Sequence, residues 1–178
     1  MKRIAFALAT LLAAPAMAQT VAPVASPGVS SSKDLWANFT SNITKSAEQM
    51  PESDYSFKPV ATVRSFGQLI GHVAGAQYMF CALALGEPAR AEGDVESKVT
   101  TKAGLVVALK ASTEYCQRAY AQTDAGSAAP IKMFGQDRTR MYALIMNAAH
   151  NAEHYGNLVT YMRVKGMVPP SSQPRPAM

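Results

Sequence analysis

The sequence of 178 residues predicts an all-α protein that folds as a four-helix bundle. Four segments carry apolar residues at alternating spacings of three and four, the period of a helix with one buried face. Glycine or proline follows the first, second and fourth of these segments and ends the helical pattern. The nearest approach to a strand pattern, at residues 60–63, is too short to compete. Four amphipathic helices with polar connections bury their apolar faces by packing against one another.

The N-terminal region has the pattern of an export signal. Two basic residues precede an apolar run at residues 4–12, and a small-x-small cleavage site ends at Ala18. We therefore interpret residues 1–18 as a signal peptide, which directs the protein to the periplasm or out of the cell. Residues 19–32 are small, uncharged and proline-containing, as in a flexible leader. No later segment offers the roughly 20 apolar residues of a membrane-spanning helix, so we expect none in the mature chain.

The first helix is expected to begin after Ser31 and to end before Pro51. Ser31 with Asp34 resembles an N-cap pair, and residues 51–64 have no period, which indicates a loop. The predicted buried stripe of this helix is Leu35, Trp36, Phe39, Ile43, Ala47 and Met50.

The second helix is expected to begin at Phe66 and to end near Gly86. Ser65 and Gln68 have the spacing of a capping box, and glycine favours the left-handed conformation that ends a helix. His72 lies on the same side as the apolar residues, so it should point at or near the core. The predicted stripe is Phe66, Leu69, Val73, Ala76, Phe80 and Leu83.

Two further helices are predicted at about residues 101–122 and 137–165, with a loop at 124–136 between them. The polar connection at residues 87–98 is long enough to cross the bundle, so we expect a long crossover between the second and third helices. The stripe of the third helix includes Leu105, Leu109 and Cys116, and that of the fourth is Met141, Leu144, Ile145, Ala148, Ala152, Tyr155, Val159 and Met162.

The chain carries two cysteines, Cys81 and Cys116. An even number in an exported protein favours a disulfide, and the alternative is two buried free thiols that pack as small apolar groups. Antiparallel second and third helices joined by a short turn would hold these cysteines far apart. Parallel helices would bring them to similar heights. Because a disulfide requires Cα atoms within about 7 Å, a bridge would support the crossover.

Composition indicates one domain, which we place at residues 33–170, followed by a disordered tail at 171–178. The formal charge is +5, and removal of the signal peptide takes two of the 17 basic residues and no acid, which leaves +3. No cluster of Lys and Arg is visible, and a nucleic-acid surface would need one. We therefore exclude nucleic acid as a partner.

The histidines are the strongest indication of chemistry. His150 and His154 are one helical turn apart, so both leave the same face of the fourth helix. His72 is the third and last histidine of the chain. Together they predict a three-histidine metal site between the second and fourth helices. The alternative is that they are polar-face residues or core imidazoles with satisfied hydrogen bonds.

Polar residues continue along the face that carries the histidine pair. Asn147, Asn157 and Tyr161 lie on it, which predicts a pocket with hydrogen-bonding walls around the site. Glu153 adjoins His154 but should point about 100° away around the helix, so we expect it in solvent rather than in catalysis. Tyr155 should point away in the same manner and pack.

Two motifs resemble a known family. They are Arg64-Ser-Phe-Gly-Gln-Leu-Ile-Gly-His72 and the later His150-x-x-x-His154-Tyr-Gly-x-Leu-Val-x-Tyr-x-Arg163-x-x-Gly166-x-Val-Pro-Pro. Both are similar to motifs of the DinB/YfiT-like superfamily of metal-dependent four-helix-bundle proteins. The resemblance covers nearly the whole mature chain. It implies a bundle with a long crossover, His72, His150 and His154 as ligands, and zinc or nickel as the metal, with open coordination positions.

The function implied by this resemblance is metal-dependent chemistry on a small molecule. Three neutral imidazoles leave a position open on a divalent ion, which lowers the pKa of a bound water or thiol. Characterised members use low-molecular-weight thiols, and an exported chain departs from that pattern because the cytosolic thiol pool is absent outside. We therefore expect an exported metal-dependent hydrolase or transferase. The alternatives are a non-catalytic metal- or small-ligand-binding bundle and a bundle without metal, and a homodimer is compatible with any of these.

Overall fold

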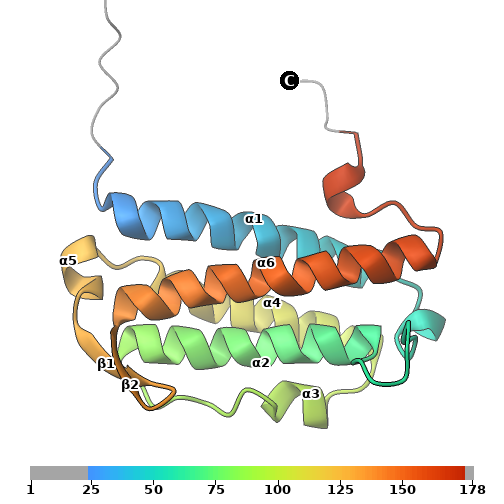
Figure 1. The fold of residues 1–178 in the computed structure, drawn as a ribbon, viewed down its shortest axis with the longest axis horizontal. Helices are drawn as coiled ribbons and strands as arrows, with labels where there is room; N and C mark the ends of the chain where they lie inside the picture. The colour runs from blue at the N-terminus through green and yellow to red at the C-terminus, as the bar shows by residue number, and fades with distance from the viewer. Residues whose placement is uncertain (1–23, 175–178) are drawn as a thin grey trace, which may run out of the picture.

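The computed structural model describes residues 24–174 and consists mainly of four long helices. They are α1 (Pro27–Gln49), α2 (Phe66–Leu85), α4 (Lys102–Ala119) and α6 (Arg140–Val164). Figure 1 shows α6 between α1 and α2, with α4 behind them. The predicted four-helix bundle is confirmed. The short elements around it are η1 (Glu52–Asp54), α3 (Asp94–Lys98), α5 (Asp124–Ser127), β1 (Pro130–Met133), β2 (Gln136–Thr139) and η2 (Pro170–Ser172).

The second and third long helices, α2 and α4, run parallel, as the long crossover predicted. Gln77 on α2 donates to Ser112 on α4 at 3.0 Å, and one turn later Cys81 and Cys116 form a disulfide with Cα atoms 5.3 Å apart. Partners therefore advance in the same direction along both helices. The connection passes over the outer side of α2 and includes α3 (Figure 1).

The start of α1 corrects two predictions. The helix begins at Pro27, not after Ser31, so the second half of the predicted leader is helical. Proline suits the first turn of a helix, but the deciding contact is tertiary: the carboxylate of Asp124 accepts hydrogen bonds from the backbone nitrogens of Gly28 and Val29 at 2.9 and 2.8 Å. A cap supplied from 96 residues away leaves no local sequence pattern. The predicted signal peptide and residues 19–23 lie outside the described residues.

The C-terminal segment is also more ordered than predicted, as far as residue 174. Residues 170–172 form a 3₁₀ turn, and the backbone nitrogen of Ser171 donates to the Tyr155 hydroxyl at 2.9 Å. Gln173 donates to Gln49 at the end of α1 at 3.1 Å. These contacts fasten the segment to the bundle, so the predicted disorder is wrong for residues 171–173. Residues 175–178 lie outside the described part of the chain.

A β-hairpin lies where a loop was predicted. Strands β1 and β2 pair antiparallel, and Met133 pairs with Gln136. Phe134 and Gly135 between them both have positive φ, the requirement of the two-residue turns that join hairpin strands. The hairpin extends to Thr139, whose side chain caps α6, so α6 begins at Arg140 rather than at residue 137.

The core follows most of the predicted stripes, with two exceptions. Leu35 and Ile145 were expected to be buried, but they are 55% and 51% exposed and line a shallow apolar groove between α1 and α6. Asn151 is fully buried on α6 instead, and its amide donates to Thr40 on α1 at 2.8 Å. Because Asn151 has its hydrogen-bond partner on another helix, it can be buried, and the buried face of α6 differs from the face that the apolar spacing predicts.

By length and composition alone, helix α2 is apolar enough to cross a membrane, which the sequence analysis did not recognise. However, 72% of its most apolar window is buried inside the bundle. This is the pattern of the central helix of a bundle, because α2 packs against both α4 and α6.

Candidate metal centre

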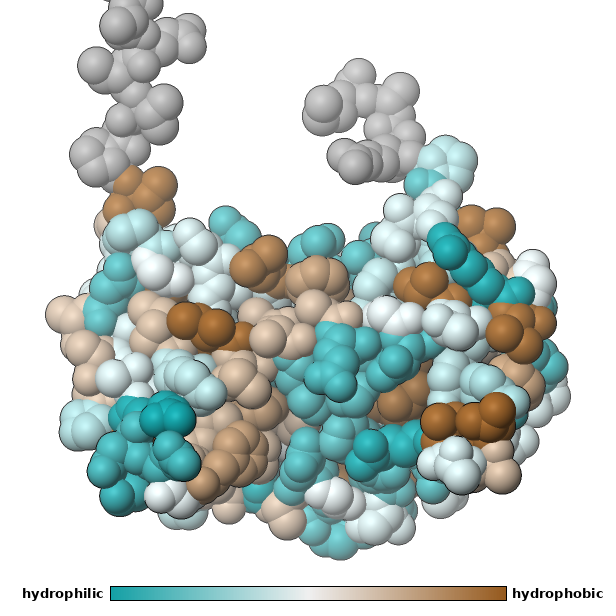
Figure 2. Space-filling model, viewed as in Figure 1, coloured by the Kyte–Doolittle hydropathy of each residue, from teal (hydrophilic) through white to brown (hydrophobic). Residues whose placement is uncertain are grey.

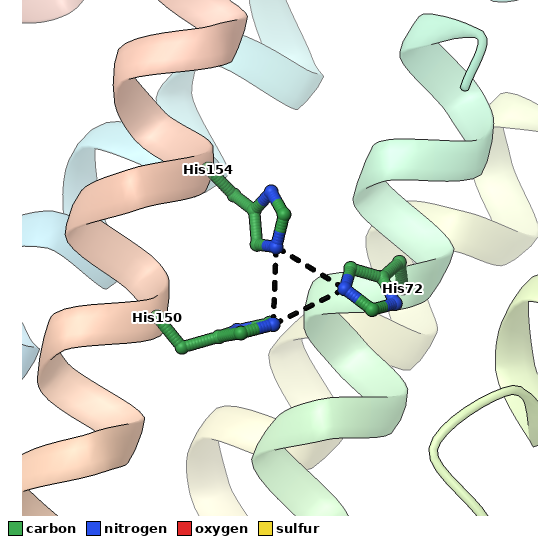
Figure 3. A group of neighbouring side chains, drawn as sticks. All are labelled: His72, His150 and His154. Atoms are coloured by element: carbon green, nitrogen blue, oxygen red, sulfur yellow. Dashed lines mark hydrogen bonds between the residues drawn. The ribbon is translucent and has the colours of Figure 1, made fainter. Parts of the chain in front are cut away.

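The three histidines come together because α2 and α6 pack antiparallel. Cys81 lies near Asn147, and His72, about two and a half turns earlier on α2, lies near His150 and His154, which come later on α6. The start of α2 is fixed by the predicted capping box, in which Ser65 and Gln68 each bond the other's backbone nitrogen. The histidines of both helices face the space between α2 and α6 (Figure 3).

The three Nε2 atoms converge on a single point. His72 Nε2 lies 3.1 Å from both His150 Nε2 and His154 Nε2, and the latter two are 3.0 Å apart. Figure 3 shows His72 reaching from α2 and the other two rings from α6, with the three nitrogens turned inward. The predicted constellation is therefore present as a nearly equilateral triangle of ring nitrogens.

No choice of tautomers satisfies this triangle by hydrogen bonding alone. A ring nitrogen of a neutral imidazole either donates or accepts, so at most two of the three contacts can pair a donor with an acceptor. One pair always sets two N–H groups or two lone pairs against each other. A single cation removes the conflict, because it accepts a lone pair from all three nitrogens.

Burial keeps these imidazoles neutral and able to bind a metal at neutral pH. Desolvation, with the nearby Arg64 charge next in importance, lowers the pKa of His72 from 6.5 to about 4. Desolvation and the neighbouring histidines lower the pKa of His150 to about 3. Desolvation also lowers the pKa of His154. Protons therefore compete only weakly with a metal for the three nitrogens near pH 7.

The spacing of the nitrogens fits a divalent transition metal. Metal–nitrogen bonds of about 2.0–2.1 Å place two ring nitrogens about 2.9 Å apart at a right angle and about 3.3–3.4 Å apart at a tetrahedral angle. The observed separations of 3.0–3.1 Å lie between these values. Imidazole ligands suit zinc, nickel, copper and iron, so the donor set fits the expected zinc or nickel without selecting one of them.

Two carboxylates lie beside the histidines. They belong to the polar connection between α2 and α4, which the sequence analysis did not link to the site. Glu92 Oε1 is 3.6 Å from Nε2 of both His72 and His150. Glu96 Oε2 is 3.7 Å from His72 Nδ1, and its carboxylate is bonded by the Arg64 guanidinium at 3.0 Å. The signal in the sequence was a pair of acids four residues apart in the crossover, but nothing local indicated that the crossover would lie on the histidine side of α2.

A cleft of about 680 Å³ opens beside His154. Asn157 and Tyr161 line it, in agreement with their predicted place in a pocket wall, and Glu153 lies at its exposed rim. Asn147 lies elsewhere: its amide donates to the disulfide sulfur of Cys81 at 3.3 Å. The remaining lining residues are Lys58, Ala61, Thr62, Val63, Arg64, Gln68, Leu69 and Glu96.

Asn157 and Tyr161, which line the cleft, also contact other parts of the site. The amide of Asn157 lies 3.3 Å from His154 Nδ1, the ring nitrogen that faces away from the triangle. The hydroxyl of Tyr161 donates to the backbone carbonyl of Arg64 at 2.6 Å and so fixes the loop that carries this guanidinium. Tyr155 is buried, as expected. The space-filling view shows hydrophilic residues gathered over α6 and α2 and continuing toward α3 (Figure 2).

Comparison with known proteins agrees with this geometry. The sequence model of the DinB superfamily matches residues 36–158, which include all three histidines. The chain belongs to the DinB superfamily. No curated protein matches it significantly.

Several solved structures share the DinB fold with this chain. A DinB-like protein from Bacillus subtilis is 26% identical, with a TM-score of 0.62, 80% of this chain covered and 99% of the other. YfiT from Bacillus subtilis, described as a probable metal-dependent hydrolase with an unusual four-helix bundle topology, is 14% identical, with a TM-score of 0.64 and coverages of 85% and 95%.

A mycothiol-dependent maleylpyruvate isomerase also shares the fold, with 15% identity and a TM-score of 0.64. The alignment covers 73% of this chain but spans only 60% of the isomerase. At this level of identity the likeness concerns the fold alone.

Proposed function

We propose that this DinB protein is an exported hydrolase that depends on a divalent metal held by His72, His150 and His154. The observation that carries the proposal is the convergence of three neutral Nε2 atoms between α2 and α6, next to a cleft that reaches His154. Three buried nitrogen lone pairs that point at one another do not contribute to packing, whereas one metal ion would bind all three. The cleft gives a small substrate a route to such an ion.

The protein residues of the cleft would bind and orient the substrate. A divalent ion in the triangle would supply an electrophile and an activated water at neutral pH. Lys58 and Arg64 bring positive charge to the wall, and Glu96 and Glu153 bring negative charge. Polar groups outnumber apolar ones around the cleft, which favours a small polar substrate over an aliphatic one. Asn157, in contact with His154 Nδ1, keeps that imidazole turned toward the triangle.

Hydrolysis is favoured over thiol transfer by the compartment that the chain indicates. The signal-like N-terminus and the Cys81–Cys116 disulfide both support an oxidising location outside the cytosol. Low-molecular-weight thiols are scarce there, whereas water is always available. Zinc and nickel both remain compatible with three imidazoles.

The test uses the mature chain freed of metal by a chelator and then reloaded with zinc or nickel. We expect one metal to support hydrolysis of a member of a panel of small esters, amides and lactones. The rate should fall by at least about a hundredfold in the apoprotein, because Lewis-acid stabilisation is worth several kcal/mol.

The control for this test is the His154→Ala variant assayed with the same panel and metals, and its rates should match those of the apoprotein. A parallel assay with added thiol separates transfer from hydrolysis. Turnover that requires the thiol would overturn the hydrolase proposal, and equal rates with and without metal would overturn the metal-dependent one.

A further inference from the structure

We propose that Glu92, on the crossover between α2 and α4, is a fourth protein ligand of the metal and that two glycines of α2 place it there. This inference rests on the metal centre proposed above. It makes the site a three-histidine, one-carboxylate centre, and it gives the crossover a part in metal binding.

The carboxylate of Glu92 lies at the distance of a metal ligand from two of the histidines. Its Oε1 is 3.6 Å from Nε2 of His72 and equally 3.6 Å from Nε2 of His150. An oxygen and a nitrogen that share a metal with bonds of about 2.0–2.2 Å are about 2.9 Å apart at a right angle and about 3.6 Å apart at 120°. The observed separation falls at the upper end of this range. Among residues 24–174, these imidazoles are the only ion-pair partners of Glu92.

Helix α2 carries two glycines, which have no side chain, where the crossover passes against it. An atom placed at the Cβ position of Gly75 would lie 1.8 Å from the backbone oxygen of Glu92. One turn earlier, a Cβ on Gly71 would lie 2.8 Å from Cα of Glu96. Real Cβ atoms do not approach so closely, so only glycine at both positions lets the crossover rest on the helix. The two glycines lie on either side of His72 and thereby bring both acids to the histidine cluster.

Hydrogen bonds on both sides of Glu92 hold the crossover against the bundle. Glu96 is bonded through both carboxylate oxygens by Arg64 at 3.0 and 3.2 Å. On the other side, Glu87 accepts hydrogen bonds from Tyr115 and from Arg118 on α4, the latter at 2.7 Å. Glu92 lies between these anchors with its side chain 37% exposed, free to move the short distance to an ion.

A fourth protein ligand restricts the coordination of the metal. The carboxylate contacts His72 and His150, whereas the cleft reaches the site at His154. An ion that holds these four ligands and still meets a substrate needs at least five coordination positions. Nickel takes such geometry readily and zinc adopts five-coordination in some catalytic sites, so a strictly tetrahedral catalytic ion is excluded.

The test measures metal affinity and coordination geometry without any substrate. The mature protein and its Glu92→Gln variant are titrated with zinc and nickel against a chromophoric chelator, and cobalt-loaded samples are compared by visible absorption. Asp94→Asn is the matched control, because Asp94 lies on the same segment and pairs with Lys98 instead of a histidine. We expect the Glu92→Gln variant to bind at least about tenfold more weakly and to change the cobalt spectrum, and the Asp94→Asn variant to do neither.

A second pair of variants tests the placement of the crossover. Gly75→Ala forces the Glu92 backbone away from α2, whereas Gly156→Ala adds the same methyl to α6 where nothing lies within 4 Å. We expect Gly75→Ala to weaken metal binding at least about tenfold with its helicity retained, and Gly156→Ala to bind as the wild type does.

The outcomes separate this inference from the proposed function. A wild-type protein that binds no metal contradicts the metal centre itself. A wild type that binds metal, together with a Glu92→Gln variant of unchanged affinity and unchanged cobalt spectrum, overturns only the role of Glu92 as a ligand. That role is equally overturned if the variant loses hydrolytic activity alone, since Glu92 would then act on the substrate or its proton.

Discussion

Replacement of both Cys81 and Cys116 by alanine is expected to lower the free energy of unfolding by about 4 kcal/mol. The bridge closes a loop between residues 35 apart in sequence, and the chain-entropy relation gives about 4 kcal/mol for a loop of that length. It also joins α2, which carries His72, to α4 near the C-terminal ends of both helices. A loss of this size is a large share of the roughly 5–15 kcal/mol that is usual for a domain.

Urea unfolding followed by circular dichroism measures this loss. The comparison is between the oxidised wild type and the double variant, with the wild type unfolded in strong reductant as an independent control that leaves the side-chain volumes unchanged. The variant and the reduced protein should unfold at similar, much lower midpoints. A difference below about 1 kcal/mol from the oxidised protein would show that the bridge does not stabilise the fold in the manner proposed.

Removal of the metal is expected to have a comparable effect on stability. An ion bound through His72 on α2 and through His150 and His154 on α6 joins the two helices only in the folded state. At a free metal concentration a thousand times the dissociation constant, such binding adds about 4 kcal/mol. Thermal unfolding with and without chelator measures it, and the His150→Ala/His154→Ala variant should show no chelator effect. A variant that responds as the wild type does would place the metal elsewhere.

The metal-free protein should also lose stability in acid, and the sign follows from the pKa values. Burial lowers the pKa of His72 to about 4 and that of His150 to about 3, whereas the unfolded imidazoles titrate near 6.5. Below pH 6.5 the unfolded chain therefore binds protons that the folded chain does not, so the free energy of unfolding falls as the pH drops toward 4. Bound metal opposes this loss by keeping the imidazoles deprotonated. Urea unfolding of the metal-free protein at a series of pH values measures the effect, and a stability that stays constant between pH 7 and about 4 would contradict it.

The features that could be predicted from the sequence are those that local spacing determines. The turn between His150 and His154, the capping box at Ser65 and the apolar period of α2 are all encoded within a few residues. The parallel course of α2 and α4 was also accessible, because the length of the crossover and the two cysteines constrained it together.

The features that could not be predicted depend on partners distant in sequence. Asp124, 95 residues away in sequence, caps the start of α1 at Pro27. Asn151 is buried with its amide bonded to Thr40 on α1, whereas Ile145 on the same helix is 51% exposed. The place of Glu92 beside the histidines depends on Gly71 and Gly75 of α2. The spacing of apolar residues in the sequence does not show that these two positions require glycine rather than another small residue.

The most direct test of the metal centre is elemental analysis of the mature protein purified without a polyhistidine tag, beside the His150→Ala/His154→Ala variant. We predict about one equivalent of zinc or nickel per chain in the wild type and none in the variant, with the helical content of both unchanged. Wild-type protein that contains no metal, and takes up none when zinc or nickel is added, would contradict the metal centre and leave the three histidines as residues of a metal-free pocket.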